Sequence, residues 1–127
     1  MKKAVALIAA VAVAAAWLRW RPFRVAIAGA SMSPALEPGD WAVAVRVDRV
    51  GRGDIVVLDD PRTPGFELVK RVTRVGSEGV WIEGDSPAVS TDSRTFGPVP
   101  GSAIAGRVVG IYAPLARAGV VRGRSGR

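Results

Sequence analysis

The sequence predicts a mainly β fold, a compact antiparallel β domain preceded by one N-terminal apolar helix. Three observations lead to this prediction. The chain opens on an uncharged apolar stretch over residues 4–18. After Pro22, short apolar stretches alternate with turns rich in Gly and Pro, which is the pattern of an all-β domain. A length of 127 residues allows one domain with a modest core and is too short for two.

The N-terminal apolar stretch is expected to anchor the chain in a membrane. It lies between Lys2 and Lys3 on one side and Arg19 on the other. It reaches the length of a bilayer span, about 20 residues, when the flanking tryptophans and Arg19 lie at the interface. We therefore expect a single-pass anchor over residues 1–22. A cleaved signal peptide is the alternative, because a basic start followed by an apolar, Ala-rich run also fits one. Basic residues on both sides leave the orientation open.

The rest of the chain divides into a β domain over residues 23–114 and a tail over residues 115–127. Within the domain, residues 37–40 read as a tight turn, because Pro presets φ and Gly supplies a positive φ. Residues 77–79 read as the turn of a hairpin. The tail is rich in Arg, Gly and Ala, and we expect it to be basic and disordered. The expected strands cover residues 24–28, 41–47, 54–58, 67–74, 80–83 and 104–112.

Composition excludes several kinds of chemistry. The chain has no Cys and no His, so thiolate nucleophiles, Cys-ligated metals and His-based catalysis are excluded. We expect neither a metal nor an organic cofactor. The formal net charge is +7, but the ends carry the excess: between residues 25 and 116, nine Lys and Arg face eleven Asp and Glu. Basic ends on a slightly acidic domain favour a membrane as partner over nucleic acid.

Lys70 is the candidate general base. It is one of three lysines, and the other two lie at the extreme N-terminus. Arg stays protonated in proteins, whereas a desolvated Lys loses its proton near neutral pH. On a strand, Lys70 shares its face with Leu68 and Val72, and these apolar neighbours should lower its pKa. A surface lysine on a half-exposed strand is the alternative.

Ser31 is the candidate nucleophile. Gly29 precedes it and would let an extended peptide backbone lie alongside. Met32 would offer an apolar surface to a peptide, and Pro34 would stiffen the chain after the nucleophile. A Ser/Pro turn between two strands is the alternative interpretation.

A third segment, residues 84–99, is polar and rich in turn residues and begins with Gly84-Asp85. Together with the Ser-Met-Ser-Pro and Lys-Arg-Val segments around Ser31 and Lys70, it resembles the type I signal peptidase family of serine proteases. That family places a Ser-Met-x-Pro box, a Lys-Arg-Val box and a Gly-Asp-x…Ser-x-Asp-Ser-Arg-x-x-Gly-x-Val box in this order, and all three are present in order.

The resemblance implies that Ser31 attacks the scissile carbonyl carbon while Lys70 takes its proton. It implies that Ser90 holds the Lys amine in place. Asp92 and Arg94 would brace the site as a charge pair, and Asp85 and Ser93 would be structural. The backbone N–H of Ser31 would donate to the oxyanion, because Gly29 stands where some family members carry a second, hydroxyl donor.

The expected function is the removal of an N-terminal leader from a precursor protein. The substrate could be exported proteins generally. Alternatively, the chain resembles the maturation proteases of nickel-type superoxide dismutase, through the Arg-Trp-Arg-Pro-Phe-Arg-Val segment before the first box and the Ser-Thr-Asp-Ser-Arg-Thr-Phe-Gly-Pro-Val segment near the end. A self-cleaving repressor-type Ser–Lys protease is a rival that would need a DNA-binding helix pair upstream. A catalytically idle, membrane-tethered binding module is another.

Overall fold

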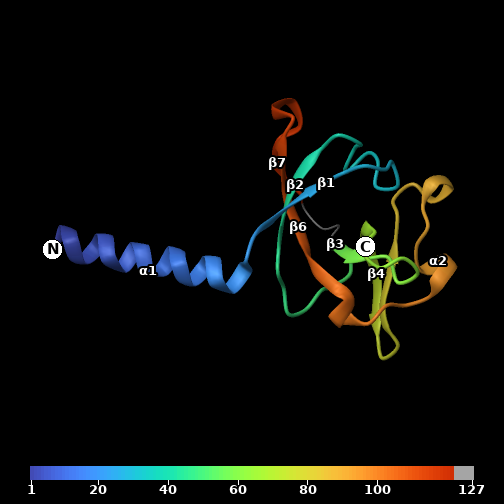
Figure 1. The fold of residues 1–127 in the computed structure, drawn as a ribbon, viewed down its shortest axis with the longest axis horizontal. Coiled ribbons are helices and arrows are strands. Elements are labelled where there is room, and N and C mark those ends of the chain that lie inside the picture. The colour runs from blue at the N-terminus through green and yellow to red at the C-terminus, as the bar shows by residue number, and fades with distance from the viewer. Residues whose placement is uncertain (122–127) are drawn as a thin grey trace.

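The computed structural model describes residues 1–121, and it consists of one helix followed by an antiparallel sheet (Figure 1). Helix α1 spans Lys2–Trp20, points away from the domain and buries none of its residues. By length and composition it is apolar enough to cross a membrane. It ends where Arg21 adopts a left-handed backbone conformation, and Pro22 cannot continue it. The expected N-terminal apolar helix is therefore confirmed.

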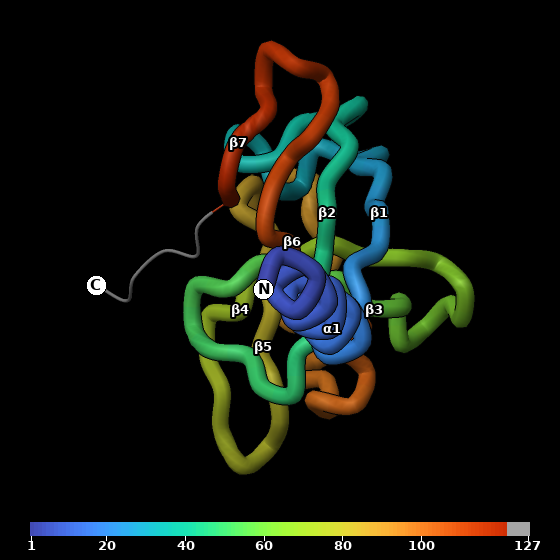
Figure 2. Tube along the Cα trace, turned by 90° about the vertical axis from the view of Figure 1, so that its left-hand side faces the viewer, coloured from blue at the N-terminus to red at the C-terminus, as the bar shows by residue number. Residues whose placement is uncertain are grey.

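Seven strands form one antiparallel sheet in the order β1-β2-β6-β3-β4-β5, with β7 paired to β6. All six expected strands are present, and their ends differ from the expectation by at most two residues. Figure 2, which looks along α1, shows the β4–β5 hairpin and the β6–β7 turn projecting to opposite sides of the domain. The strands are β1 Phe23–Ala26, β2 Trp41–Val45, β3 Ile55–Asp59, β4 Glu67–Gly76, β5 Gly79–Glu83, β6 Ile104–Ala113 and β7 Gly119–Val120.

The predicted turns also form. Gly39 has φ +92°, and the Asp40 N–H donates to the Glu37 carbonyl oxygen, which closes the tight turn over residues 37–40. The β4–β5 hairpin turns after Gly76 and resumes at Gly79. These turns fix the register of the strands on either side, so local sequence accounts for much of the sheet.

Strand β3 lies between two apolar cores. Its residues alternate between them: Ile55 and Val57 pack into one core with Val25 and Leu36, whereas Val56 and Leu58 pack into the other. All four β3 residues are therefore buried, which explains why they form a continuous apolar run. Strand β4 follows antiparallel to β3 and carries Lys70 on the face of the second core, together with Leu68 and Val72.

The connection between β5 and β6 folds back over the second core. It contains the short helices η1 (Pro87–Val89), α2 (Ser93–Phe96) and η2 (Gly101–Ala103). Asp92 caps α2 by accepting a hydrogen bond from the Arg94 N–H, and Val99 pairs with Val80 in an isolated bridge. Both contacts close the connection, so that Ser90 and Asp92 return to the side of the sheet where Lys70 lies.

The structure of the C-terminal segment differs from the expected disordered tail. Residues 115–121 are ordered rather than disordered: helix η3 spans Leu115–Arg117, and β7 pairs with β6. Two tertiary features explain the order. Strand β6 offers a free edge at Gly110 and Ile111, and a buried carboxylate, Asp40, accepts hydrogen bonds from Arg117. The remaining part of the expected tail, residues 122–127, lies outside the described residues.

Candidate active site

Ser31 lies just beyond β1, in a loop of small residues that the β5–β6 connection holds in place. The Ser86 N–H donates to the Ser31 carbonyl oxygen at 2.8 Å, and the Ser86 hydroxyl donates to the Ser33 carbonyl oxygen at 2.9 Å. The backbone at Ser31 and two residues after it is therefore held by a segment more than fifty residues away in sequence. This fixation directs the hydroxyl toward β4.

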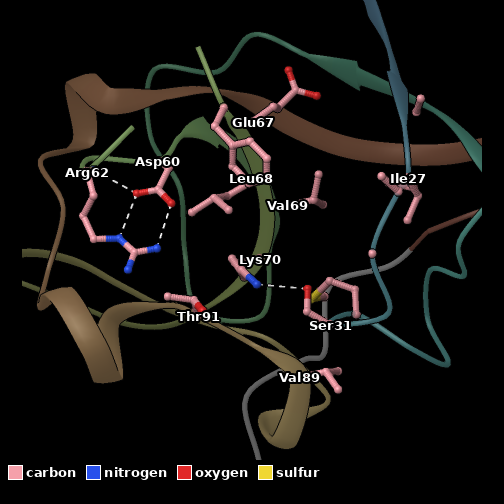
Figure 3. A pocket seen from close by; sticks show the side chains of 15 residues that line it. Ile27, Ser31, Asp60, Arg62, Glu67, Leu68, Val69, Lys70, Val89 and Thr91 are labelled. Carbon is pink, nitrogen blue, oxygen red and sulfur yellow. Dashed lines mark hydrogen bonds and ion pairs between the residues drawn. The ribbon is translucent and has the colours of Figure 1, made fainter. Parts of the chain in front are cut away.

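The Lys70 amine meets two hydroxyl groups at the site, and Figure 3 shows its contact with one of them, Ser31. Its Nζ lies 2.9 Å from Ser31 Oγ and 3.1 Å from Ser90 Oγ. The Lys70 side chain is buried, with a residue exposure of 4%. The Lys70 amine therefore lies within hydrogen-bond reach of both Ser31 and Ser90, although the three residues come from separate parts of the chain.

Burial lowers the pKa of the Lys70 amine below its ordinary value. Asp92 and Asp60 oppose this shift by favouring the ammonium form, and the positive charge of Arg94 reinforces it, so that the net change of the pKa is downward. The direction is the one a general base requires, because a lower pKa leaves a larger neutral fraction near pH 7.

Asp92 and Arg94 form the expected charge pair behind Ser90. The Arg94 guanidinium donates to both carboxylate oxygens of Asp92, at 3.0 and 2.6 Å, and the Ser90 hydroxyl donates to Asp92 Oδ2 at 2.5 Å. Asp92 is buried at 1% exposure. Burial alone would raise the pKa of its carboxyl, but these hydrogen bonds and one from the Gly84 N–H hold it well below the ordinary range. Because Ser90 donates to Asp92, its oxygen faces the Lys70 amine as an acceptor.

Asp85 and Ser93 contact the strands below the site. The carboxylate of Asp85 accepts two hydrogen bonds from Arg71, each at 2.9 Å, and Arg71 also donates to the Gly53 carbonyl oxygen. The Ser93 hydroxyl accepts from the Ile82 N–H at 2.9 Å. Both residues tie the β5–β6 connection to the sheet.

Gly84 occupies a position whose importance the sequence alone does not reveal. A Cβ placed there would lie 2.3 Å from Ser90 Oγ and 2.8 Å from the Ser31 carbonyl oxygen. No real Cβ makes such contacts, so any side chain must displace one of these two groups. A glycine at position 84 therefore allows the loop that carries Ser31 and the loop that carries Ser90 to approach each other.

We expect Gly84→Ala to lower kcat by about 100-fold, because moving Ser90 or Ser31 by even about 1 Å separates the Lys70 amine from its partners. Cleavage kinetics on a precursor substrate would measure this loss. Gly76→Ala is the matched control, since a Cβ at Gly76 would meet nothing within 4 Å, and we expect it to keep full activity. Equal activity in the two variants would contradict the close packing at Gly84.

A cleft of about 410 Å³ opens in front of Ser31 and Lys70. One wall is the chain from Ala26 to Gly29, which continues from β1 at the edge of the sheet. The opposite wall is residues 66–70. Strand β5 pairs with β4 only from Arg71 to Gly76. The first part of β4, residues 67–70, therefore has no β5 partner and borders the cleft. Two strand edges therefore face the space in front of Ser31.

The structure places Gly29, Met32 and Pro34 differently relative to the cleft. Gly29 lines the cleft, and a side chain there would meet open space. Met32 also touches the cleft, but at 2% exposure most of its side chain belongs to the core. Pro34 lies outside the cleft on an exposed turn, where its carbonyl oxygen accepts a hydrogen bond from Arg117.

Further residues of the cleft escaped the sequence analysis. Asp60 and Arg62, from the β3–β4 loop, line it as an ion pair with two hydrogen bonds of 3.0–3.2 Å between the side chains (Figure 3). Glu67 stands at the start of β4, and burial together with Asp59 raises the pKa of its carboxyl. The Asp-Pro-Arg sequence indicates a turn, but no local signal shows that this turn borders the cleft.

The fold and the site together define a class of protein: a β domain on an apolar helix that presents a serine hydroxyl to a buried lysine amine, without His or Cys. Residues 1–86 match the model of the family described as signal peptidase, peptidase S26. The chain belongs to this family, and the resemblance stated from its three motifs is confirmed.

Curated relatives agree with this family. The human mitochondrial inner membrane protease subunit 1 is 33% identical over 120 residues, which cover 74% of this chain and 71% of the relative. Subunit 2 of the same protease from Schizosaccharomyces pombe is 37% identical over 120 residues, covering 73% and 66%. The Arabidopsis thaliana mitochondrial ATP-independent inner membrane protease subunit 1a is 36% identical over 110 residues, covering 64% of each chain.

Proposed function

We propose that this protein is a membrane-anchored serine endopeptidase that removes an N-terminal leader from a precursor protein, with Ser31 as nucleophile and Lys70 as general base. The observation that carries the proposal is the 2.9 Å contact between Ser31 Oγ and a Lys70 amine that is 4% exposed. A hydroxyl and a desolvated amine at this distance are suited to nucleophilic acyl transfer.

The proposed reaction has two steps. In the first, the neutral Lys70 amine accepts the Ser31 hydroxyl proton while Ser31 Oγ attacks the peptide carbonyl carbon. The backbone N–H of Ser31 stabilises the oxyanion, and the protonated amine delivers its proton to the leaving nitrogen as the C–N bond breaks. In the second step, Lys70 accepts a proton from water, the hydroxide attacks the acyl ester, and the proton returns to Ser31 Oγ.

Ser90, Asp92 and Arg94 would position the amine through this cycle. The Ser90 oxygen accepts from Lys70 in either protonation state, because its own proton is directed to Asp92. Arg94 keeps Asp92 ionised and fixed in orientation. The amine is thus held beside Ser31 Oγ without giving up its free lone pair.

The cleft supports an extended peptide as the substrate. A segment lying between residues 26–29 and residues 66–70 could pair with both strand edges, as in β-strand addition. Backbone pairing accepts many sequences, and side-chain selection would come from the small space beside Ser31. This form of recognition suits a leader segment that is unfolded when it is cut.

A membrane location for the reaction has two supports. Helix α1 is long and apolar enough to span a bilayer and contributes nothing to the domain core. The relatives named above are inner membrane proteases. The same helix bears on the repressor-type alternative, since residues 2–20 form one continuous apolar helix where a DNA-binding helix pair would be needed.

Cleavage of two precursors, with N-terminal sequencing of the products, tests this proposal. One is a nickel superoxide dismutase precursor and the other a secretory preprotein whose leader ends in Ala-x-Ala. We expect the wild type to release a single mature N-terminus and Ser31→Ala to release none. Cleavage of the first precursor alone would identify a dedicated maturation protease, and cleavage of the second a general leader peptidase. Ser31-independent cleavage, or none of either precursor, would instead favour the binding module.

A further inference from the structure

The loop that carries Ser31 ends at a buried carboxylate. Asp40 is 2% exposed and stands at the point where the loop enters β2. Its backbone carbonyl oxygen accepts from the Ile27 N–H, and its Oδ2 accepts from the Glu37 N–H at 2.8 Å. Asp40 therefore closes the loop onto the strand that precedes Ser31. A buried carboxylate needs a cation to remain ionised at low cost.

That cation comes from the C-terminal segment. Arg117, in η3, donates from Nε to both carboxylate oxygens of Asp40, at 2.8 and 3.0 Å. Its Nη2 donates to the Pro34 carbonyl oxygen at 3.4 Å, in the middle of the same loop. The Arg117 hydrogen bonds hold the pKa of the Asp40 carboxyl below its ordinary range despite the burial. Figure 2 shows the chain turning after β6 and returning beside it as β7.

The two ends of the nucleophile loop, residues 31–40, are thus held by different parts of the molecule. The β5–β6 connection holds the start of the loop, where Ser86 contacts Ser31 and Ser33. The C-terminal segment holds the end of it. Within residues 1–121, Asp40 has one cationic partner at ion-pair distance, Arg117, so losing that side chain would leave a buried charge with backbone donation alone.

We propose that Arg117 is a positioning residue for the nucleophile: the C-terminal segment clamps the loop of residues 31–40 through Asp40 and Pro34, and so keeps Ser31 Oγ within reach of the Lys70 amine. This inference rests on the proposed function. It assigns the C-terminal segment a part in the reaction, although none of residues 115–121 lines the cleft.

The test is steady-state cleavage by the full-length chain carrying Arg117→Met, at a temperature at which unfolding measurements show it to be folded. We expect kcat to fall about 10- to 100-fold and KM to change much less, because the loop relaxes while most of the cleft wall on β4 stays in place. Arg117→Lys restores the positive charge and should recover a large part of kcat. Arg107→Met is the matched control, since Arg107 approaches Asp54 at 3.9 Å on another part of the sheet; it should keep wild-type kinetics.

Hydrogen exchange of the loop amides gives a second readout that does not depend on activity. The Glu37, Gly39 and Asp40 amides should exchange faster in Arg117→Met than in the wild type or Arg107→Met, because their acceptors lie on Asp40 and on the chain it holds. Unchanged exchange together with unchanged kcat would overturn the clamp. A wild type that cleaves neither precursor would refute the proposed function instead, and the exchange data would still decide whether Arg117 holds the loop.

Discussion

Replacing Lys70 by Met should abolish precursor cleavage, with a loss of kcat/KM of about 1,000-fold or more. Met keeps the length and much of the apolar volume of the Lys side chain but has no group that can accept the Ser31 proton. Lys70→Arg should be equally inactive, because a guanidinium stays protonated at every pH at which the protein is folded. Initial rates on the precursor that the wild type cleaves would measure both losses.

Two controls separate catalysis from folding in this experiment. Ser31→Ala/Lys70→Met should be no slower than either single variant, because the two groups act as one unit. Folding lowers the pKa of Lys70, so the unfolded chain binds the Lys70 proton more tightly than the folded chain does. Below the ordinary Lys pKa, this difference lowers the free energy of unfolding. Lys70→Met should therefore leave the free energy of unfolding unchanged or raise it. A folded Lys70→Met retaining more than about a tenth of wild-type kcat/KM would refute the Lys base.

The second large effect is on the pH dependence of cleavage. Below the pKa of Lys70 in the free enzyme, kcat/KM should fall about tenfold for each unit of decreasing pH, since only the neutral amine accepts the Ser31 proton. The midpoint of this acidic limb should lie below the ordinary Lys value of about 10.4, because burial disfavours the ammonium form. A rate that stays constant through the acidic range, with the protein still folded, would exclude a lysine base.

Arg94 allows the assignment of that limb to be checked. The positive charge of Arg94 lowers the pKa of Lys70, whereas the negative charge of Asp92 raises the pKa of Lys70. Arg94 also balances the charge of Asp92. Arg94→Met removes the positive charge that lowers the pKa of Lys70 and leaves the Asp92 carboxylate unbalanced. The pKa of Lys70 should therefore rise, and the acidic limb should move to higher pH. Arg94→Lys keeps the charge and should move it less. Arg107→Met, which removes an equal charge elsewhere, should leave the limb where it is in the wild type.

The sequence by itself determined the secondary-structure elements and the candidate catalytic pair. Apolar runs, prolines and glycines act over a few residues, and they predicted α1, six strands and the turn at Gly39 to within two residues. Ser31 and Lys70 could be identified from the sequence for a different reason. Without His or Cys, few side chains can serve as a general base. Local motifs around them and at Gly84-Asp85 then gave the family.

The tertiary structure alone decided how distant segments meet. Arg117 lies 77 residues from Asp40 in the sequence. The composition of the tail suggested disorder, and it could not reveal that the buried Asp40 carboxylate pairs with Arg117. Met32 faces the core, and Asp60 faces the cleft, because of how the loop and the β3–β4 turn pack. The need for glycine at position 84 comes from Ser90 and the Ser31 carbonyl on two other segments. Such contacts depend on burial and on the approach of segments far apart in the chain, which no local pattern encodes.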